Sequence, residues 1–469
     1  MKVLLVNPPR FDLMRYGLPT IDIHGPPLGI ASIAAFLEKR DVEVAVEDYH
    51  YRSWEAVEES IRKESPDIVG ITTLSQQRGS VFRLIRLIKE VKDSIKIVLG
   101  GPHAHFMYEQ ILENHPVDFI VLGEGEETFL DLVGAVDGSA DISLVKGIAY
   151  KDGGRAVTTG PREPIGDLGK LPFPAYHLFD IDGYPPGERL RGYTRDGVKL
   201  DGIKFTTYSF SRGCTGRCSF CSTFKFWGNT WRCRSPEKVV DDLEILSKEY
   251  GRRYITFVDD IFTVNKNKVI GICRGIIDRK LNILWDCETR VDFVSDEMLR
   301  WMRKAGCVAV DYGVESASRE VLEAIHKKTT PERIAGAIRI TSDSGIRTNL
   351  LLMVGNPGES DASISATEKL IKDSRPDKIT VNIAMVFPGT ALYELARSKG
   401  IVDDKFWLTE RPAPFYTAEQ PLRRLKMWSD RLMSANSNSI MRFARGVRSQ
   451  IGMRTGFSIT RQGIHRYKT

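Results

Sequence analysis

The chain has 469 residues, enough for two or three domains with separate cores. Its hydrophobic fraction of 42%, its charged fraction of 27% and its net charge of +6 are those of an ordinary soluble globular protein. No stretch reaches about 18 consecutive apolar residues, which excludes a transmembrane helix, and the N-terminal apolar run ends at Pro8, too early for a signal peptide. The seven cysteines, three of them in one loop, do not form a secreted disulfide framework, so we expect a reducing, cytoplasmic compartment.

Short apolar runs alternate with segments of helical spacing through the first third of the chain. The runs predict strands at Lys2–Asn7, Val42–Val46, Asp67–Thr72, Lys96–Leu99 and Asp118–Leu122. The segments between them predict helices at Leu28–Glu38, Trp54–Glu64, Gly79–Lys92 and Tyr108–Asn114. This alternation predicts an α/β domain over residues 1–140, with a doubly wound, Rossmann-like parallel sheet that binds ligands where its strands end.

Polar and glycine-rich loops follow four of these strands. They begin at Asn7, Thr72, Gly100 and Gly123. Glycine at a strand end lets the backbone approach a bulky ligand closely. None of the loops has the G-x-G-x-x-G spacing, which argues against a dinucleotide.

A hairpin at Gly147–Val157 and a proline-rich stretch at Pro161–Tyr184 lead to a second βα series, so we expect residues 141–200 to form a linker with a hairpin. The later strands are expected at Lys204–Phe210, Tyr254–Val258, Ile283–Cys287, Val308–Gly313, Thr348–Val354 and Lys378–Val386. Helices are expected between and after them at Pro236–Tyr250, Lys266–Arg279, Asp296–Lys304, Ser318–Ala324, Pro331–Ser342 and Ile364–Asp373. Six such units over residues 201–400 predict a partial (β/α)6 TIM-type barrel, open rather than closed.

Three cysteines follow the first strand of this barrel. Cys214, Cys218 and Cys221 have the spacing C-x3-C-x2-C, and Phe220 precedes the third. Three thiolates on one loop suit a soft metal centre, either zinc or an iron–sulfur cluster. A structural zinc site needs a fourth ligand, and Cys233 lies twelve residues further on, outside any paired spacing. Three ligands on four irons would leave one iron open.

The cysteine spacing with its aromatic residue resembles the radical S-adenosylmethionine (radical SAM) superfamily. Together, this motif and the strand-end loops of the first third resemble the cobalamin-dependent radical SAM enzymes. The resemblance covers the whole first third of the chain and about 200 residues of the barrel. The resemblance implies three cofactors: a 4Fe-4S cluster on the three cysteines, S-adenosyl-L-methionine and cobalamin.

The resemblance also implies binding residues for S-adenosylmethionine at the barrel strand ends. They are Phe220, Asp259, Arg290, Glu315 and Gly355. Glu315 could accept from the ammonium group of the methionine end, and Arg290 could donate to its carboxylate. Other interpretations remain open, because Asp259 and Asp260 could cap the next helix and Glu315 could be a helix N-terminal carboxylate.

For cobalamin, the resemblance implies residues at the strand ends of the first domain. They are Asn7, Pro8, Thr72, Thr73, Leu74, Ser75, Gln76, Gly100, Gly101, His103 and Glu124. Residues 48–53 nearly spell D-x-H-x-x-G, the motif that supplies a histidine to cobalt in methionine-synthase-type domains. Here the motif follows the second strand and ends in Ser53, so we expect His50 to be a surface or loop residue, with Gln76 or Arg78 nearer to cobalt.

The C-terminal region, residues 401–469, is expected to be basic and helical. Past Pro421, arginines and lysines interleave with apolar residues, and Asp430 is the one acid. Such a helix could lie on an anionic membrane surface, clamp an anionic substrate, cover the barrel mouth or be merely solvated. Nucleic acid is not expected, since aromatic stacking platforms are missing from this basic stretch.

The resemblance implies a methyltransferase that acts on an unactivated carbon through a 5′-deoxyadenosyl radical and methylcobalamin. A cobalamin-containing radical SAM cyclase or rearranging enzyme without methyl transfer is the alternative. A non-catalytic corrinoid-binding protein is a third interpretation, against which the intact cysteine triplet argues. A methylthiotransferase is disfavoured because the first domain has no cysteine. No catalytic side chain beyond the cluster ligands is evident in the sequence.

The expected partners follow from this chemistry. They are a small-molecule substrate that is hydrophobic or anionic (a lipid, a tetrapyrrole or a natural-product intermediate) and an electron donor of the flavodoxin or ferredoxin type. Peripheral membrane contact is expected only through the basic C-terminal region.

Overall fold

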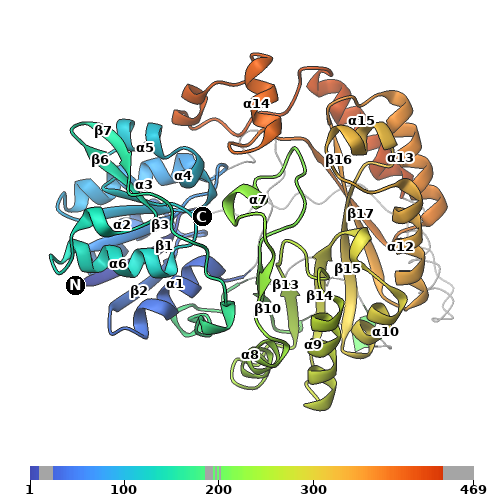
Figure 1. The fold of residues 1–469 in the computed structure, drawn as a ribbon, viewed down its shortest axis with the longest axis horizontal. Helices are drawn as coiled ribbons and strands as arrows, with labels where there is room; N and C mark the ends of the chain where they lie inside the picture. Colours follow the sequence, from blue (N-terminus) through green and yellow to red (C-terminus); the bar gives the residue numbers. More distant parts are fainter. Residues whose placement is uncertain (10–24, 185–193, 196–197, 200–201, 437–469) are drawn as a thin grey trace, which may run out of the picture.

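The computed structural model describes residues 1–9, 25–184, 194–195, 198–199 and 202–436. Two α/β units, each built around its own sheet, lie side by side (Figure 1). The short α7 helix (Thr223–Phe226), which follows the three cysteines, lies between them. The expected fold class is confirmed.

The first sheet has seven strands in the order β2-β1-β3-β4-β5-β6-β7. The first five are parallel, as predicted: β1 (Lys2–Asn7), β2 (Glu43–Asp48), β3 (Ile68–Thr72), β4 (Lys96–Gly100) and β5 (Phe119–Val121). The hairpin of β6 (Ile148–Asp152) and β7 (Arg155–Thr158) adds two antiparallel strands to the edge, beside β5. The strand order reverses between β1 and β3, the place where such sheets bind ligands.

Helices cover both faces of this sheet. They are α1 (Leu28–Glu38), α2 (Trp54–Glu64), α3 (Arg78–Val91), α4 (Pro102–Phe106), α5 (Tyr108–Asn114) and α6 (Glu126–Val136). α1 and α6 contribute to one apolar core, and α2, α3 and α5 to the other. The sequence pattern did not predict α6, whose first turn carries Glu126 and Glu127 in a stretch interpreted as a loop.

The second sheet has six parallel strands in chain order, which confirms the open partial barrel. The strands are β10 (Phe205–Tyr208), β13 (Tyr254–Phe257), β14 (Leu284–Thr289), β15 (Cys307–Glu315), β16 (Arg347–Val354) and β17 (Lys378–Ile383). The outer helices are α8 (Pro236–Lys248), α9 (Lys266–Asp278), α10 (Asp296–Lys304), α11 (Arg319–Ala324), α12 (Pro331–Asp343) and α13 (Asp361–Ser374). Alternate strand residues such as Tyr208, Phe257 and Trp285 face these helices in one core.

Short elements connect the two units. The strand pairs are β8 (Thr194–Arg195) with β9 (Val198–Lys199), and β11 (Ser211–Arg212) with β12 (Arg232–Cys233). Single 3-10 turns lie at Ile142–Leu144, Leu168–Lys170, Tyr176–Leu178, Val291–Phe293 and Asp404–Leu408. The hydroxyl of Tyr176 in the linker donates to the carbonyl of Thr207 on β10 at 2.6 Å, which joins the linker to the barrel.

After β17 the chain returns to the first unit. α14 (Ala391–Ser398) and the buried residues Trp407, Ala413 and Tyr416 belong to the same apolar core as Leu4 and Phe82. α15 (Leu422–Ala435) then packs on α13 through Leu425, Trp428 and Leu432. The expected amphipathic helix therefore exists, but its apolar face is buried against the barrel.

α15 also forms ion pairs with α13. Arg424 pairs with Asp361 at 2.5 Å, and Arg431 pairs with Glu368 at 2.6 Å. The rest of the expected basic stretch, residues 437–469, lies outside the described residues. In the described part of the chain, no helix is both long and apolar enough to cross a membrane.

Candidate active site

The loop of residues 213–231, which holds the three cysteines, is closed at its base by β11 and β12. Ser211 lies opposite Cys233 in this antiparallel pair, and Arg212 lies opposite Arg232. Gly213 has φ +91°, and a Cβ there would lie 2.1 Å from the carbonyl oxygen of Thr230. Only glycine therefore allows the two ends of the loop to approach this closely.

Asp259, which follows β13, fixes the start of this loop. One of its carboxylate oxygens accepts from the backbone N–H of Phe210 at 3.1 Å and of Ser211 at 2.7 Å. The hydroxyls of Ser209 and Ser211 donate to the same oxygen. Burial raises the pKa of Asp259 to about 7 despite these four hydrogen bonds. Asp260 is held differently, by the hydroxyl of Thr223 in α7 at 3.3 Å.

The sulfurs of Cys214 and Cys218 lie beside Gly216. Its N–H donates to Cys214 Sγ at 3.2 Å, and a Cβ there would lie 3.3 Å from Cys214 Sγ and 3.9 Å from Cys218 Sγ. Cys218 is buried, and Cys214 and Cys221 are half-buried. Burial raises the pKa of Cys214 and of Cys218, while Lys327 and Arg290 act in the opposite direction on Cys218.

This donor set fits a cluster better than a zinc ion. Zinc would draw its sulfur ligands to about 2.3 Å from a single centre, whereas each cysteine of a 4Fe-4S cluster binds its own iron. Cys233 lies at the base of the loop, beside Lys268. It is not part of the group around Gly216.

Arg290 and Glu315, both predicted to bind S-adenosylmethionine, lie on one side of Cys218. Nη1 of Arg290 is 3.8 Å from Cys218 Sγ, and its Nε donates to Asp292 at 3.1 Å. Glu315 pairs with Lys327 at 2.8 Å, and the Lys327 ammonium lies 5.8 Å from the centre of the Phe220 ring. The structure thus brings Phe220, Arg290 and Glu315 together around Cys218.

Glu315 also has a strained backbone. Its φ is +63°, and the pairing of β15 with β16 shifts register between Gly313 and Glu315. A non-glycine residue in this region of φ is uncommon and is often found at functional sites.

Gly355, the fifth predicted residue, follows β16 with φ +88°. Its N–H donates to the carboxylate of Glu359, and a Cβ would lie 3.0 Å from Leu425 of α15. Its nearest neighbours therefore come from the C-terminal helix. Burial raises the pKa of Glu359 to about 7.

Two loops of the first sheet, Thr72–Gln76 and Gly100–His103, are held together. Thr73 N–H donates to the carbonyl of Gly100 at 2.8 Å, and His103 N–H donates to the carbonyl of Thr73 at 3.1 Å. Ser75 Oγ lies 3.0 Å from Nδ1 of His103. Gly101 has φ +91°, and a Cβ there would lie 3.0 Å from the backbone of Thr73.

Buried polar atoms at this edge have no hydrogen-bond partner among the described residues. They include Oγ1 of Thr73, Oε1 of Gln77 and Nε2 of His103. Such atoms in a native protein call for an unseen partner. A Cβ at Gly100 or Gly123 would meet no atom of the described residues within 4 Å, so the backbone is open there to a bulky ligand. These features fit a large cofactor with many polar groups.

The side chains of the two loops differ in their surroundings. His103 is fully buried, and burial together with Arg78 lowers its pKa to about 3, so its ring is neutral. Gln76 Nε2 lies 3.4 Å from Met385 Sδ, and Leu74 is 41% exposed. Arg78 donates to the carbonyl of Ser75 at 2.8 Å and lies 4.8 Å from the centre of the Trp407 ring.

The remaining predicted residues of the first unit lie around this edge. Asn7 donates to Asp48 at 2.9 Å, and Pro8 is buried directly after it. His50 lies in the loop after β2, with its N–H donating to Asp48 at 3.0 Å. Glu124 instead lies between the two units, where it accepts from Arg232 at 2.5 Å and from the N–H of Ile165 at 2.9 Å.

Four further residues of the site were not anticipated. Gly216 lies beside the sulfurs of Cys214 and Cys218, Lys327 pairs with Glu315, and Arg212 and Arg232 bind the carboxylates of Glu126 and Glu124. The two arginines flank the cysteine loop in the sequence, and this position could have identified them as part of the site. Nothing near Lys327 in the sequence marks it.

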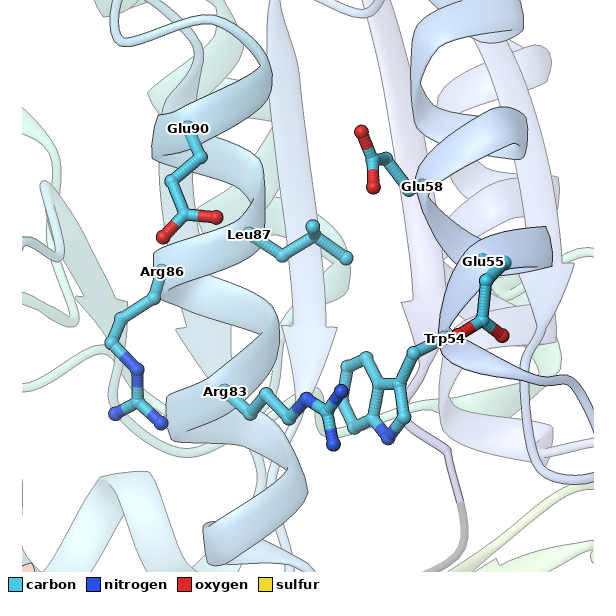
Figure 2. Close-up of a pocket in the computed structure, with 7 residues that line it drawn as sticks. All are labelled: Trp54, Glu55, Glu58, Arg83, Arg86, Leu87 and Glu90. Atoms are coloured by element: carbon cyan, nitrogen blue, oxygen red, sulfur yellow. The ribbon is translucent and has the colours of Figure 1, made fainter.

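A separate cleft of about 350 Å³ lies between α2 and α3 of the first unit (Figure 2). It is lined by Trp54, Glu55, Glu58, Arg83, Arg86, Leu87 and Glu90. The guanidinium of Arg83 lies 4.2 Å from the centre of the Trp54 ring. Glu55 and Glu58 lie on the α2 side of this cleft and Arg83, Arg86 and Glu90 on the α3 side, so it lacks the single-sign charge of a phosphate or cation site.

Comparison with known proteins matches both halves of the chain. Residues 18–133 match the B12 binding domain family, and residues 208–371 match the Radical SAM superfamily. An uncharacterized methyltransferase of Pyrococcus horikoshii is 32% identical over 436 residues, covering 92% of this chain and 90% of that protein. The anaerobic magnesium-protoporphyrin IX monomethyl ester cyclase of Rubrivivax gelatinosus is 35% identical over 403 residues, covering 83% of this chain and 68% of the cyclase.

A solved structure shares the fold. It is the radical S-adenosylmethionine methyltransferase TsrM of Kitasatospora setae with cobalamin and a [4Fe-4S] cluster bound. The TM-score is 0.68 at 21% identity, and the match covers 85% of this chain and 75% of TsrM.

Proposed function

Since this chain belongs to the cobalamin-dependent radical SAM enzymes, we propose that it is a methyltransferase that places a methyl group on an unactivated carbon. One observation carries the proposal: the loop that holds the cysteines meets the ligand-binding edge of the first unit. The ring of His105 in α4 lies 5.4 Å from that of Phe226 in α7, and Phe220 packs on the apolar core that the first unit shares with α14 and the chain after β17. The two candidate sites therefore face one another.

Each side chain at the cysteine loop has a definite task in this proposal. Cys214, Cys218 and Cys221 hold the cluster. Arg290 and Lys327 place positive charge beside the Cys218 thiolate, which favours its ionised form. We assign Arg290 to the carboxylate of S-adenosylmethionine and Glu315 to its ammonium group. Asp259, although predicted as a binding residue, holds the backbone at the start of the loop, so we assign it a supporting role.

In the first unit, the loops Thr72–Gln76 and Gly100–His103 would hold cobalamin. Gly100 and Gly123 would allow close approach, and Thr73 and His103 would offer the buried polar atoms that have no partner among the described residues. When bound, the cluster with S-adenosylmethionine supplies a carbon-centred radical, and cobalamin supplies the methyl group. Trp407 lies against His103 and Phe226 against His105, and these aromatic contacts would help to exclude water.

The remaining assignments extend the proposal. We divide the chain into a cobalamin-binding domain (1–140), a linker (141–200) whose β6–β7 hairpin joins the sheet of that domain, a radical SAM domain (201–400) and a C-terminal region (401–469). The substrate is a small molecule, which we propose to be hydrophobic or anionic, and the electron donor is of the flavodoxin or ferredoxin type. The apolar face of α15 is covered by the barrel, so this helix does not offer it to a membrane.

The second candidate function is a cyclase without methyl transfer, favoured by the 35% identity to the Rubrivivax gelatinosus enzyme. One assay separates the two. Reduced, cofactor-loaded protein is incubated anaerobically with methyl-labelled S-adenosylmethionine and a small-molecule extract of its source cells. A methyltransferase yields S-adenosylhomocysteine and a labelled product, in amounts that rise together. Formation of 5′-deoxyadenosine with neither of these would refute methyl transfer and favour the cyclase.

A further inference from the structure

Four charged residues join the base of the cysteine loop to the first unit. Arg212 and Arg232, which face each other across β11 and β12, each reach a carboxylate in or just before α6. Arg212 binds Glu126 through both of its terminal nitrogens, one of them at 3.2 Å. Arg232 binds Glu124 at 2.5 Å, and Arg212 also approaches Glu124 at 3.5 Å.

These charges are removed from water. The side chains of Arg212 and Arg232 are 15% and 10% exposed, and those of Glu124 and Glu126 are 7% and 3% exposed. Two positive and two negative charges balance. Removing one partner would leave a buried charge uncompensated, which is strongly destabilising, whereas replacing both partners is often tolerated.

Neutral hydrogen bonds complete the group and limit the directions in which the arginines can point. Ser32 of α1 donates to Glu126 at 2.6 Å, and Arg232 donates to the carbonyls of Ile165 at 2.6 Å and Trp227 at 3.2 Å. Arg232 thereby contacts the linker, the first unit and the cysteine loop at once.

The position of this group in the chain gives it a role beyond stability. Arg212 is two residues before Cys214, and the whole loop of residues 213–231 lies between the two arginines. Asp259 fixes the same base to the barrel through the backbone of Phe210 and Ser211. The loop base is therefore attached to both units at once. Hydrogen bonds to the Asp259 carboxylate attach it to the barrel, and the arginine–glutamate ion pairs attach it to the first unit.

We propose that Arg212, Arg232, Glu124 and Glu126 are positioning residues that fix the cysteine loop relative to the cobalamin-binding unit. The ion pairs set the separation and orientation of the cluster and the corrin, rather than binding either cofactor. This inference rests on the proposed function, because it assumes that both cofactors are present.

The test is a double-variant cycle in the full-length chain with Glu126→Gln, Arg212→Met and both together. Two properties are measured: amide hydrogen exchange of residues 213–231 in iron-free protein, and the magnetic interaction between cob(II)alamin and the reduced cluster by electron paramagnetic resonance. Each single variant should speed exchange by about 100-fold, and the double variant by clearly less than the product of the two. The magnetic interaction should weaken or spread in the single variants at unchanged iron and cobalamin content.

Glu127→Gln is the matched control, since Glu127 is the next residue of α6 and pairs with Arg162 at 3.3 Å on the surface, 48% exposed. It should leave both properties unchanged. Wild-type exchange and magnetic interaction in both single variants, or multiplicative effects in the double variant, would overturn the inference. If the wild type takes up no cobalamin, the proposed function fails, whereas hydrogen exchange still decides whether the ion pairs hold the loop.

Discussion

The two candidate cofactor sites of this molecule are built on opposite electrostatic plans. Around Cys218 the neighbours are charged, with Arg290 against Asp292 and Lys327 against Glu315. At the edge of the first sheet they are largely neutral, with buried Thr73 and a neutral His103 whose Oγ1 and Nε2 have no partner in the part of the chain that the structure describes. The difference follows from the ligands, because thiolates and a zwitterion need counter-charges, whereas a bulky corrin needs room and neutral hydrogen bonds.

The largest expected effect separates the cluster ligands from the other cysteines. Cys218→Ala should abolish iron binding and cleavage of S-adenosylmethionine, since the remaining two thiolates cannot hold the cluster. Cys233→Ala is the control and should keep both, because Cys233 lies at the loop base. Iron content and 5′-deoxyadenosine formation are measured together. If Cys218→Ala keeps both its iron and its 5′-deoxyadenosine formation, the charged site around Cys218 does not hold the cluster.

Within the charged site, we expect the backbone at the loop base to be the most sensitive to substitution of a glycine. Gly213→Ala would force a Cβ to within 2.1 Å of a carbonyl oxygen, so we expect a loss of roughly 3 kcal/mol or more in unfolding free energy. Gly228→Ala shares the positive φ but meets its nearest atom only at 3.9 Å, and should cost about 1–2 kcal/mol. Chemical denaturation of both variants gives the answer, and equal losses would show that crowding at Gly213 is unimportant.

The neutral site should respond to pH. The folded pKa of His103 is about 3, below the ordinary 6.5, so its contribution to stability is complete above pH 6.5 and is lost as the pH falls towards 3. The groups that face it are Ser75, Arg78 and the Trp407 ring. Unfolding free energy should fall by about 2 kcal/mol more between pH 7 and pH 5 in the wild type than in His103→Gln. Parallel curves would show that His103 is not buried in its neutral form.

A smaller effect is expected from alanine substitutions at Gly100 and Gly101, which test whether the space beside each glycine is left for a ligand or filled by protein. Gly100→Ala should leave the melting temperature unchanged, because no atom in the described ranges of the chain lies within 4 Å of the added Cβ. It should nevertheless weaken cobalamin binding about tenfold, or 1.4 kcal/mol, if the corrin occupies that space. Gly101→Ala is the contrasting variant, with a Cβ at 3.0 Å from the Thr73 backbone, and should lower the melting temperature. Unchanged cobalamin affinity in Gly100→Ala would place the corrin elsewhere.

The sequence predicts the residues of the cysteine site, but not the ion pairs that attach its loop to the first unit. The cysteine loop is local, and Phe220, Arg290 and Glu315 follow from strand ends that meet at one edge of a parallel barrel. The partners of Arg212 and Arg232 lie 86 and 108 residues away on an unpredicted helix and the loop before it, so no pattern within a window could pair them. The return of Trp407 to the first unit was equally hidden, because burial across units leaves no periodicity.

The measurement that tests the central claim most directly is the iron and cobalamin content of protein purified anaerobically after addition of hydroxocobalamin. The structure predicts about four irons and about one cobalamin per chain, with the iron lost in Cys218→Ala and the cobalamin retained. Four irons without any corrinoid would contradict the claim, since the neutral edge of the first sheet would then serve another ligand.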